Sequence, residues 1–257
     1  MIKKFNKFLL EKAYKDEFQR LYDLAPENLK NDIDNTKKAL QNKYWHPEGD
    51  TFIHTRLVTN RLANCYNDIN LTLSGLFHDL GKFKTTYFDD KKQDWTAPGH
   101  EEISLKILLK HKDWVKEMGG DINIIYFIIQ NHMRYKYLDE MRFSEKVKLF
   151  EHPYFEYLKK FSSADYGGIG LICKDLPDFK NIENKIKQHK LKEKEDKIIS
   201  NKFNGRLIMD KYPHLKGPLL GKVINDFKNS FDDFRTFALN NSSDKIFNEF
   251  DIFLNKT

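Results

Sequence analysis

Apolar residues recur three to five positions apart through most of this 257-residue chain, and this spacing constrains the fold more than any other feature. An amphipathic helix buries residues with such a period, whereas a half-buried strand alternates them at every second position. The run IIYFII at 124–129 also has strand propensity, but no second run of similar strength exists to pair with it. The sequence therefore predicts an all-α fold. The central predicted helices cover residues 51–66, 71–80, 101–111, 122–132, 144–150 and 154–165.

Shorter signals mark where these helices begin and end. The segment HPEGD at 46–50 predicts a turn, and either Asp50 or Thr51 is expected to cap the helix that follows. Gly81 is expected to end the buried helix that precedes it. The polar stretch 82–98 predicts a loop.

The two ends of the chain continue the helical pattern. An apolar stripe at 5–24 predicts a helix that Pro26 ends, and residues 27–41 predict a second short helix. The dense Lys and Glu residues at 179–202 are typical of a solvated, partly packed helix. Residues 205–257 predict one Gly/Pro turn and two further helices.

Length and composition exclude several classes of protein. With 40% hydrophobic residues, a chain of this size can bury a sizeable core, which excludes a disordered chain and a collagen-like fibre. Cys65 and Cys173 are too few for a disulfide framework, so a reducing compartment is expected. The basic N-terminus lacks the apolar core of a signal peptide, and the longest apolar run is too short to span a bilayer. We therefore expect a soluble, cytoplasmic protein.

Histidines and aspartates recur along the predicted helices at intervals of 22 to 33 residues. Each interval is about one helical hairpin, so side chains from successive helices of a bundle can converge on one point. A buried carboxylate beside an imidazole is costly unless a cation compensates its charge, and a mixed His/Asp set suits zinc, manganese, iron or cobalt better than calcium. Any one of these histidines alone is as well explained as an ordinary core residue. The set is His54, His78, Asp79, His100, His132 and Asp165.

The order H…HD…D formed by four of these residues resembles the signature of the HD-domain metal-dependent phosphohydrolases. The local segments are similar to one branch, the HD region of bacterial CCA-adding enzymes (tRNA nucleotidyltransferases). They are HPEGDTFIHT, LFHDLGKFKTT, PGHEEIS, IQNHM, VKLF and SAD, and they follow in the same order. The segment at 204–226 resembles the region after that HD domain, where the family has a Gly-Pro turn before an RNA-contacting helix.

The resemblance implies an HD-domain helical bundle with N- and C-terminal helical extensions. The expected regions are an N-terminal helical extension at 1–45, an HD phosphohydrolase domain at 46–175 and a helical C-terminal region at 176–257. Fewer than 50 residues precede the HD region, and they contain no Gly-rich nucleotidyltransferase motif. We therefore expect the chain to hydrolyse phosphate esters and not to add nucleotides.

The resemblance also implies roles for individual residues. His54, His78, Asp79 and Asp165 are expected to bind one divalent metal ion (Mn, Mg, Ni, Co, Zn or Fe), and His78, Asp79 and Lys82 are expected to take part in catalysis. His100 and His132 are expected either to bind a second ion or to contact phosphate. Lys82 resembles the lysine that follows the HD pair in the family, and it is expected to bind substrate together with Arg134.

The substrate class stays open between alternatives. The branch resemblance points to RNA ends that carry a 2′,3′-cyclic phosphate or a 2′- or 3′-monophosphate. Free nucleotides are the alternative, hydrolysed by a 5′-monophosphatase or a dNTP triphosphohydrolase. A third interpretation is an RNA-binding module with a vestigial HD site, and a fourth is a diiron oxygenase. The net charge of +6 permits RNA binding through the basic C-terminal half but does not demand it. Trp95, Tyr135, Tyr137 and Tyr166 flank the site segments, where they either stack on a base or belong to the core.

Overall fold

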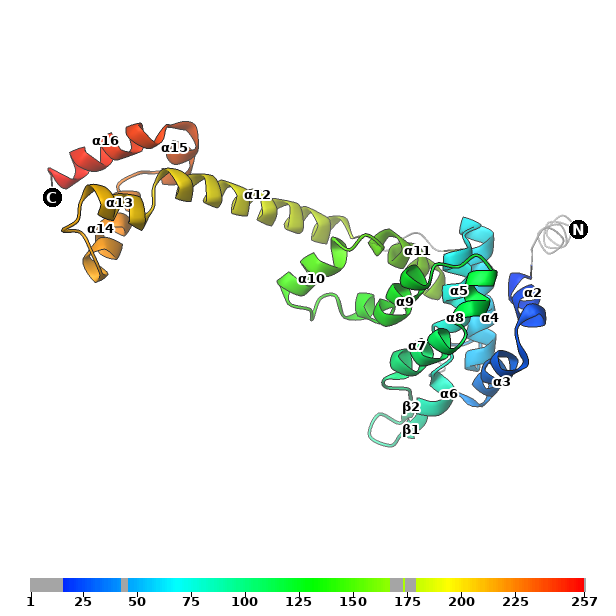
Figure 1. The fold of residues 1–257 in the computed structure, drawn as a ribbon. Helices are drawn as coiled ribbons and strands as arrows, with labels where there is room; N and C mark the ends of the chain where they lie inside the picture. Colours follow the sequence, from blue (N-terminus) through cyan, green and yellow to red (C-terminus); the bar gives the residue numbers. More distant parts are fainter. Residues whose placement is uncertain (1–15, 43–45, 167–172, 174–178, 257) are drawn as a thin grey trace, which may run out of the picture. The chain divides into compact units, whose positions relative to one another are not determined.

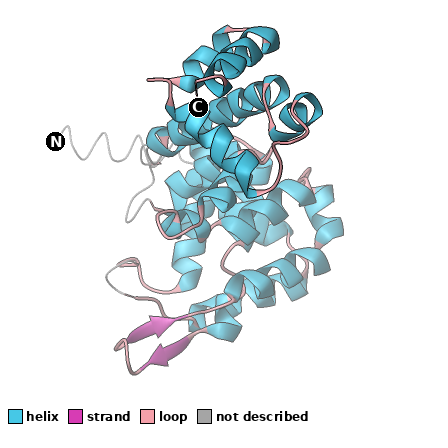
Figure 2. Ribbon diagram, turned by 90° about the vertical axis from the view of Figure 1, so that its left-hand side faces the viewer, coloured by secondary structure: helices cyan, strands magenta, loops and turns pink. Residues whose placement is uncertain are grey.

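The computed structural model describes residues 16–42, 46–166, 173 and 179–256, and these are mostly helical (Figure 1). Residues 5–15 of the predicted apolar stripe at 5–24 lie outside the described residues. The chain forms two compact units, at Met1–Asp178 and Phe179–Thr257. The division into three regions expected from the sequence stays a prediction. The all-α prediction is confirmed, since the described strands form a single small hairpin (Figure 2).

The first unit contains helices α2 to α11, two 3₁₀ turns and the hairpin. The elements are α2 (Glu17–Leu24), α3 (Glu27–Asn35), η1 (Thr36–Lys38), α4 (Thr51–Tyr66), α5 (Ile69–Phe77), α6 (Lys82–Thr85), β1 (Tyr87–Asp89), β2 (Asp94–Thr96), α7 (His100–Lys110), α8 (Lys112–Glu117), α9 (Ile122–Asn131), η2 (Arg134–Tyr137), α10 (Phe143–Phe150) and α11 (Phe155–Asp165).

Helices α4 and α5 form a closely packed hairpin. Asp50 caps α4 by accepting a hydrogen bond from the backbone N–H of Ile53, and Asn67 ends the helix in the left-handed conformation. Asp68 then caps α5. A Cβ atom at Gly75 would lie 2.8 Å from the Cα atom of Thr59, so only glycine permits this approach of the two backbones. The hairpin thus fixes the direction in which α5 enters the core.

Helix α5 is the most buried element of the first unit. Every residue from Leu71 to Phe77 is buried. Leu73, Leu76 and Phe77 join the larger apolar cluster with α2, α3, α7, α8 and α9, whereas Leu71 packs into a second cluster with α4, α9 and α11. Since residues 78 and 79 follow α5 directly, the chain delivers them into the interior.

Two predictions around the end of α5 are wrong. Gly81 was expected to end this helix, but α5 ends at Phe77 and Gly81 has a φ of −67°, which is not the left-handed cap. A Cβ atom at Gly81 would overlap the carbonyl oxygen of His100 and lie 2.8 Å from the backbone N of Ser104. Gly81 therefore permits close packing against α7. The loop predicted at 82–98 contains α6 and the β1–β2 hairpin, in which Phe88 pairs with Trp95.

The second unit is a separate helical assembly with an aromatic core. It consists of α12 (Lys180–Lys202), α13 (Gly205–Lys211), α14 (Pro218–Asn229), α15 (Phe234–Asn240) and α16 (Ser243–Leu254). The sequence predicted two helices after residue 205, and the structure has four. Short helices carry too few apolar positions to show a period, but Asn204, Asp233 and Ser242 each cap one by accepting backbone N–H bonds. Phe203, Phe227 and Phe250 form the centre of this core.

The two cysteines are paired. Cys65, near the end of α4, forms a disulfide with Cys173, 108 residues later. Cys173 packs against an apolar cluster that contains side chains of α4 and α11. Disulfides are rare in the reducing compartment that the cysteine count predicts. Within the residues that the structure describes, none of the helices combines the length and the apolar character needed to cross a membrane.

Candidate metal centre

Six buried side chains, located on five helices or directly after them, face one point inside the first unit. His54 lies on α4, and Asp165 is the last residue of α11. Each of these side chains is 4% exposed or less. The members are His54, His78, Asp79, His100, His132 and Asp165, and we call them the His/Asp cluster. The convergence that the sequence predicted for these residues is present in the structure.

The cluster divides into two sets of three possible metal ligands. In the first set, Asp165 Oδ1 lies 3.0 Å from His54 Nε2 and 3.8 Å from His78 Nε2. In the second set, Asp79 Oδ1 lies 3.2 Å from His100 Nε2 and 3.7 Å from His132 Nε2. All ligand atoms of a set lie within 4.8 Å of one another.

Asp79 links the two sets. Its second oxygen, Oδ2, lies 3.1 Å from His78 Nε2 and 3.7 Å from His54 Nε2. One carboxylate oxygen therefore faces each set. The first set would hold a single ion, and the two sets together would provide ligands for two.

Three of the histidines are oriented in the same way by the backbone. The Nδ1 atoms of His78, His100 and His132 lie 2.9, 2.7 and 2.7 Å from the carbonyl oxygen three residues earlier. A carbonyl accepts only from an N–H, so Nδ1 carries the proton and Nε2 presents its lone pair to the cluster. This is the tautomer that binds a metal through Nε2.

His54 is oriented by a carboxylate instead. Its Nδ1 atom lies 2.7 Å from Glu48 Oε1, which also lies 3.1 Å from His46 Nδ1. Burial lowers the pKa of His54, but hydrogen bonds to Asp165 and Glu48 raise it above the ordinary value. The Glu48 carboxylate at Nδ1 thus directs Nε2 of His54 toward Asp165 and the cluster.

The donor atoms of the cluster fit a divalent metal ion. Among the described residues, His78 Nε2 and Asp79 Oδ1 are buried without a hydrogen-bond partner. The Nε2 atoms of His100 and His132 face each other at 3.2 Å, although both rings have placed their proton on Nδ1. Burial and the neighbouring His100 and His78 hold the pKa of His132 well below the ordinary value, so this ring is neutral. Converging lone pairs repel unless a cation lies between them.

Both carboxylates of the cluster are ionised. Burial raises the pKa of Asp79, but His78 and Lys82 outweigh it and hold that pKa well below the usual range. Burial acts in the same direction on Asp165, whose pKa is held well below the usual range by Lys136 and His54. Two buried carboxylates whose oxygens face imidazole Nε2 atoms form a donor set that suits a divalent cation.

The two predicted substrate-binding cations occupy different positions. Lys82 Nζ lies 2.7 Å from Asp79 Oδ2 and donates to Gln41 Oε1 at 2.7 Å, so it is at the cluster. Arg134 is exposed at the start of η2, and the described residues give it no contact with the cluster. Its part in substrate binding stays a prediction.

Sequence reasoning missed three residues that contact the cluster. Glu48 was interpreted only as part of a turn, although a carboxylate six residues before His54 is a signal for a partner of that histidine. Tyr135 was considered for stacking, but it donates a hydrogen bond to Asp165 Oδ2 at 3.0 Å. Burial and the charge of Asp165 raise the pKa of Tyr135 well above its ordinary value, so the phenol stays protonated. Lys136 Nζ lies 3.9 Å from the same Asp165 oxygen.

Comparison with known proteins identifies the region that carries the cluster. Residues 51–165 match the HD domain family over their whole length. This part of the chain is an HD domain. The HD family consists of metal-dependent phosphohydrolases, which hydrolyse phosphoric esters. The matched region begins at the first residue of α4 and ends at Asp165, so it contains all six members of the cluster.

The HD domain resembles that of CCA-adding proteins. A stretch of 112 residues is 30% identical to the multifunctional CCA protein of Shewanella frigidimarina (strain NCIMB 400). The match covers 43% of this chain and 26% of that protein, so the chain spans about a quarter of this relative's length. The resemblance expected from the sequence motifs is confirmed. Comparison with solved structures gives no match.

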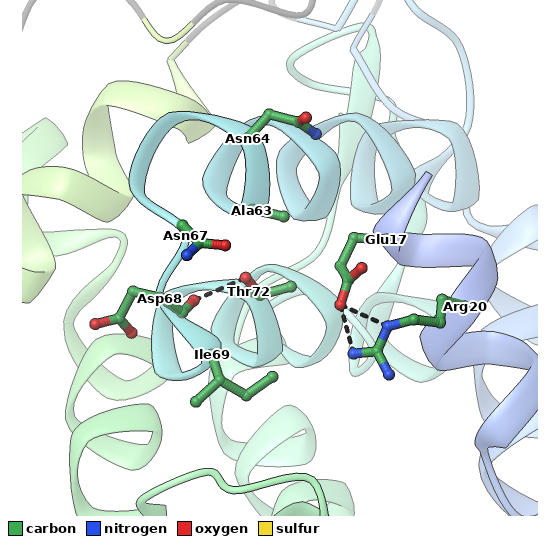
Figure 3. Close-up of a pocket in the computed structure, with 8 residues that line it drawn as sticks. All are labelled: Glu17, Arg20, Ala63, Asn64, Asn67, Asp68, Ile69 and Thr72. Carbon is green, nitrogen blue, oxygen red and sulfur yellow. Dashed lines mark hydrogen bonds and ion pairs between the residues drawn. The ribbon is translucent and has the colours of Figure 1, made fainter. Parts of the chain in front are cut away.

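A pocket elsewhere in the first unit is lined by residues with local structural roles. Figure 3 shows a pocket where α2 faces the junction between α4 and α5. Its acidic groups have local partners, because Glu17 pairs with Arg20 and Asp68 caps α5. None of its lining residues belongs to the His/Asp cluster. We therefore assign this pocket no function.

Proposed function

We propose that this chain is a metal-dependent phosphohydrolase that acts on phosphate esters at RNA ends or on nucleotides. The expected reactions are hydrolysis of a 2′,3′-cyclic phosphodiester and of a 2′- or 3′-monophosphate. One observation carries the proposal: four imidazole Nε2 atoms and two ionised carboxylates face one buried point, with His78 Nε2 and Asp79 Oδ1 unpartnered among the described residues.

The residues proposed to bind metal are His54, His78, Asp79 and Asp165. His100 and His132 complete a second set with Asp79, and we propose that they bind a second ion or contact phosphate. The preferred ion is one of Mn, Mg, Ni, Co, Zn or Fe, since imidazole and carboxylate ligands suit these metals. A divalent ion held there lowers the pKa of a water nucleophile and neutralises charge on the phosphate.

Side chains around the cluster orient its proposed ligands and add positive charge for a phosphate group. Tyr135 holds Asp165 through its hydroxyl, and Glu48 holds the proton of His54 at Nδ1. Lys82 places a positive charge beside Asp79, where a phosphate oxygen of the substrate can accept a hydrogen bond from Nζ. The burial of the cluster limits bulk water, which strengthens each of these charge interactions.

A double variant tests this proposal directly. His78→Ala with Asp79→Ala removes two proposed ligands, so hydrolysis should fall at least about a thousandfold. Far-UV circular dichroism should show that the helical content is retained. Asp113→Ala, on an exposed turn of α8, is the matched control and should keep full activity. Undiminished phosphate release by the double variant would reject the proposal.

A substrate panel distinguishes the alternatives for the same site. The panel contains RNA with 2′,3′-cyclic, 2′- and 3′-phosphate ends, nucleoside 5′-monophosphates and dNTPs, each with several divalent metals. Release from the RNA ends is the expected result. Activity confined to free nucleotides would instead make the chain a 5′-monophosphatase or a dNTP triphosphohydrolase.

We also propose that the second unit contacts RNA. Residues 179–257 contain 16 basic and 11 acidic residues, which is most of the chain's positive excess. Lys187, Lys190, Lys194 and Lys197 are exposed, and their spacing places them on one face of α12. RNA binding should weaken steeply with salt. Such binding without hydrolysis under any metal would favour an RNA-binding module with a vestigial HD site.

The proposal includes a cytoplasmic location, where nucleotides and RNA ends are present. Disulfides are rare in that compartment. The Cys65–Cys173 pair should therefore be reduced in the cell and should form on exposure to air. Thiol alkylation at the moment of lysis checks this, and full protection of both cysteines would contradict the location.

A further inference from the structure

Lys136 occupies a defined position beside the His/Asp cluster. It belongs to η2, which begins two residues after His132, and its Nζ atom lies 3.9 Å from Asp165 Oδ2. Its side chain is 29% exposed, so it connects the buried carboxylate with the surface. No metal ligand in the proposed sets is a lysine, because an ammonium group has no lone pair to offer.

Two tyrosines hold the Lys136 side chain in place. Its Nζ atom lies 5.9 Å from the ring centroid of Tyr135 and 5.8 Å from that of Tyr166, which is within the range of a cation–π contact. The two rings pack against each other with centroids 4.9 Å apart. Tyr135 also donates its hydroxyl proton to Asp165. The ammonium group is therefore directed toward the cluster and is not a freely moving surface charge.

Lys136 and Lys82 each lie beside a different carboxylate of the cluster. Lys82 pairs with Asp79, and Lys136 lies beside Asp165. A divalent ion bound by the cluster balances the charges of these two aspartates. The two lysines then add positive charge beyond what the carboxylates need, and both lysine side chains are partly exposed. Glu48 does not cancel it there, because it lies behind His54 at Nδ1.

We propose that Lys136 is a phosphate-binding residue, and that Lys136 and Lys82 together bind the phosphate of a terminal, dianionic phosphate monoester. A monoester has a second pKa near 6 and carries about two negative charges at neutral pH, whereas a diester carries one. The two positive charges of the lysines balance the two negative charges of the monoester. The inference rests on the proposed function and narrows its substrate class from phosphate esters in general to monophosphate ends.

The test measures phosphate binding separately from catalysis. Inorganic phosphate is titrated calorimetrically into the full chain loaded with Mn²⁺, at a pH of about 7.5. Lys136→Met keeps an unbranched side chain beside the two tyrosine rings and removes the charge. The phosphate Kd should rise about tenfold or more, as expected for loss of one charge-assisted hydrogen bond. Lys136→Arg should keep most of the affinity.

A second readout tests the charge of the substrate. KM and kcat are measured with p-nitrophenyl phosphate, a monoester, and with bis(p-nitrophenyl) phosphate, a diester. Lys136→Met should raise KM for the monoester several times more than KM for the diester. Lys148→Gln, an exposed lysine on α10, makes the same charge change away from the cluster and should alter neither value.

The outcomes separate this inference from the proposed function. Unchanged phosphate affinity in Lys136→Met, or a loss that Lys148→Gln shares, would overturn the inference while hydrolysis by the wild-type chain stands. Equal KM changes for both esters would overturn the assignment to dianionic monoesters. Failure of the wild-type chain to hydrolyse any ester of the substrate panel would reject the proposed function, whatever the phosphate affinity shows.

Discussion

The two units differ in whether the polar groups in their interiors have hydrogen-bond partners. In the second unit the core is aromatic, and the part-buried Lys202 ammonium donates to the carbonyl oxygens of Ala238, Leu239 and Asn241 at 2.8 to 3.0 Å. In the first unit, His78 Nε2 and Asp79 Oδ1 are buried without a partner among the described residues. Fully paired polar groups stabilise a fold, whereas converging unpaired ones indicate a ligand. The unpaired groups therefore indicate a ligand site in the interior of the first unit, whereas binding by the second unit would involve its surface.

The largest expected effect is on the free energy of unfolding of the second unit, and it tests whether the two units unfold independently. Phe250→Ala removes a fully buried ring from the second core and should lower the free energy of unfolding of that unit by about 4 kcal/mol. All three tryptophans of the sequence precede residue 179, where the second unit begins, so tryptophan fluorescence reports on the first unit alone. In a urea titration, the fluorescence midpoint should stay in place while the circular dichroism transition begins earlier. An equal shift of both signals would show that the units unfold together.

A smaller effect should come from the glycine that brings α6 against α7. Gly81→Ala forces a methyl group against the backbone of His100, so it should lower the free energy of unfolding of the first unit by about 3 kcal/mol. Because His100 must move, metal affinity should fall as well. Gly221→Ala, in α14, is the control, since a Cβ atom there meets nothing within 4 Å. Tryptophan fluorescence in urea checks the prediction, and a stability equal to that of the control would contradict it.

The carboxylate behind His54 should affect metal binding more than stability. Glu48→Gln keeps the size of the side chain but offers a neutral acceptor to the His54 Nδ1–H. We expect the Mn²⁺ affinity to fall about 10- to 100-fold, as for other partners of metal-binding histidines. Competition with a chelator measures the affinity, and Glu48→Asp should not rescue it fully because the shorter side chain cannot keep both histidine contacts. Unchanged affinity would mean that Glu48 only shapes the turn.

The smallest expected effect concerns a surface aspartate and depends on pH. Burial raises the pKa of Asp16, but hydrogen bonds from Asn60 and Arg56 outweigh it, and the pKa is lowered from its usual value near 3.8. A carboxyl group whose pKa is lowered by folding stabilises the fold at pH values above its unfolded-state pKa. The stabilisation is lost as the pH falls through the lower pKa of the folded state. Asp16→Asn should cost less than about 1 kcal/mol at pH 7 because the group is partly exposed. Urea titrations at pH 7 and pH 3 should show the difference shrinking at low pH, and a constant difference would contradict the pKa shift.

Sequence reasoning succeeded where one physical signal dominated. The helix predicted at 51–66 has those bounds in α4, because Asp50 caps its start and the apolar period continues to its end. IIYFII lies in α9, as predicted from the lack of a partner strand. The cluster was predictable because helical hairpins of similar length return their ends to one place. The HD domain was predictable from its motifs.

Other features depend on contacts between distant segments, and the sequence carries no local signal for them. The β1–β2 hairpin forms in a polar stretch, where Asn42 from another part of the chain donates to Asp94. The Cys65–Cys173 pair joins positions 108 residues apart, and Cys173 packs against an apolar cluster that contains side chains of α4 and α11. Lys136 looks like any surface lysine until η2 places it beside Asp165. Local periodicity describes helices, whereas these contacts arise only after the helices have packed.

Metal content measures the central claim most directly. The wild-type chain and the His78→Ala, Asp79→Ala variant are dialysed against Mn²⁺, freed of excess ion, and analysed by inductively coupled plasma mass spectrometry. The wild-type chain should retain one or two ions per molecule, and the variant should retain almost none at equal helical content. Equal metal in the two proteins, or none in either, would contradict a metal centre at the His/Asp cluster.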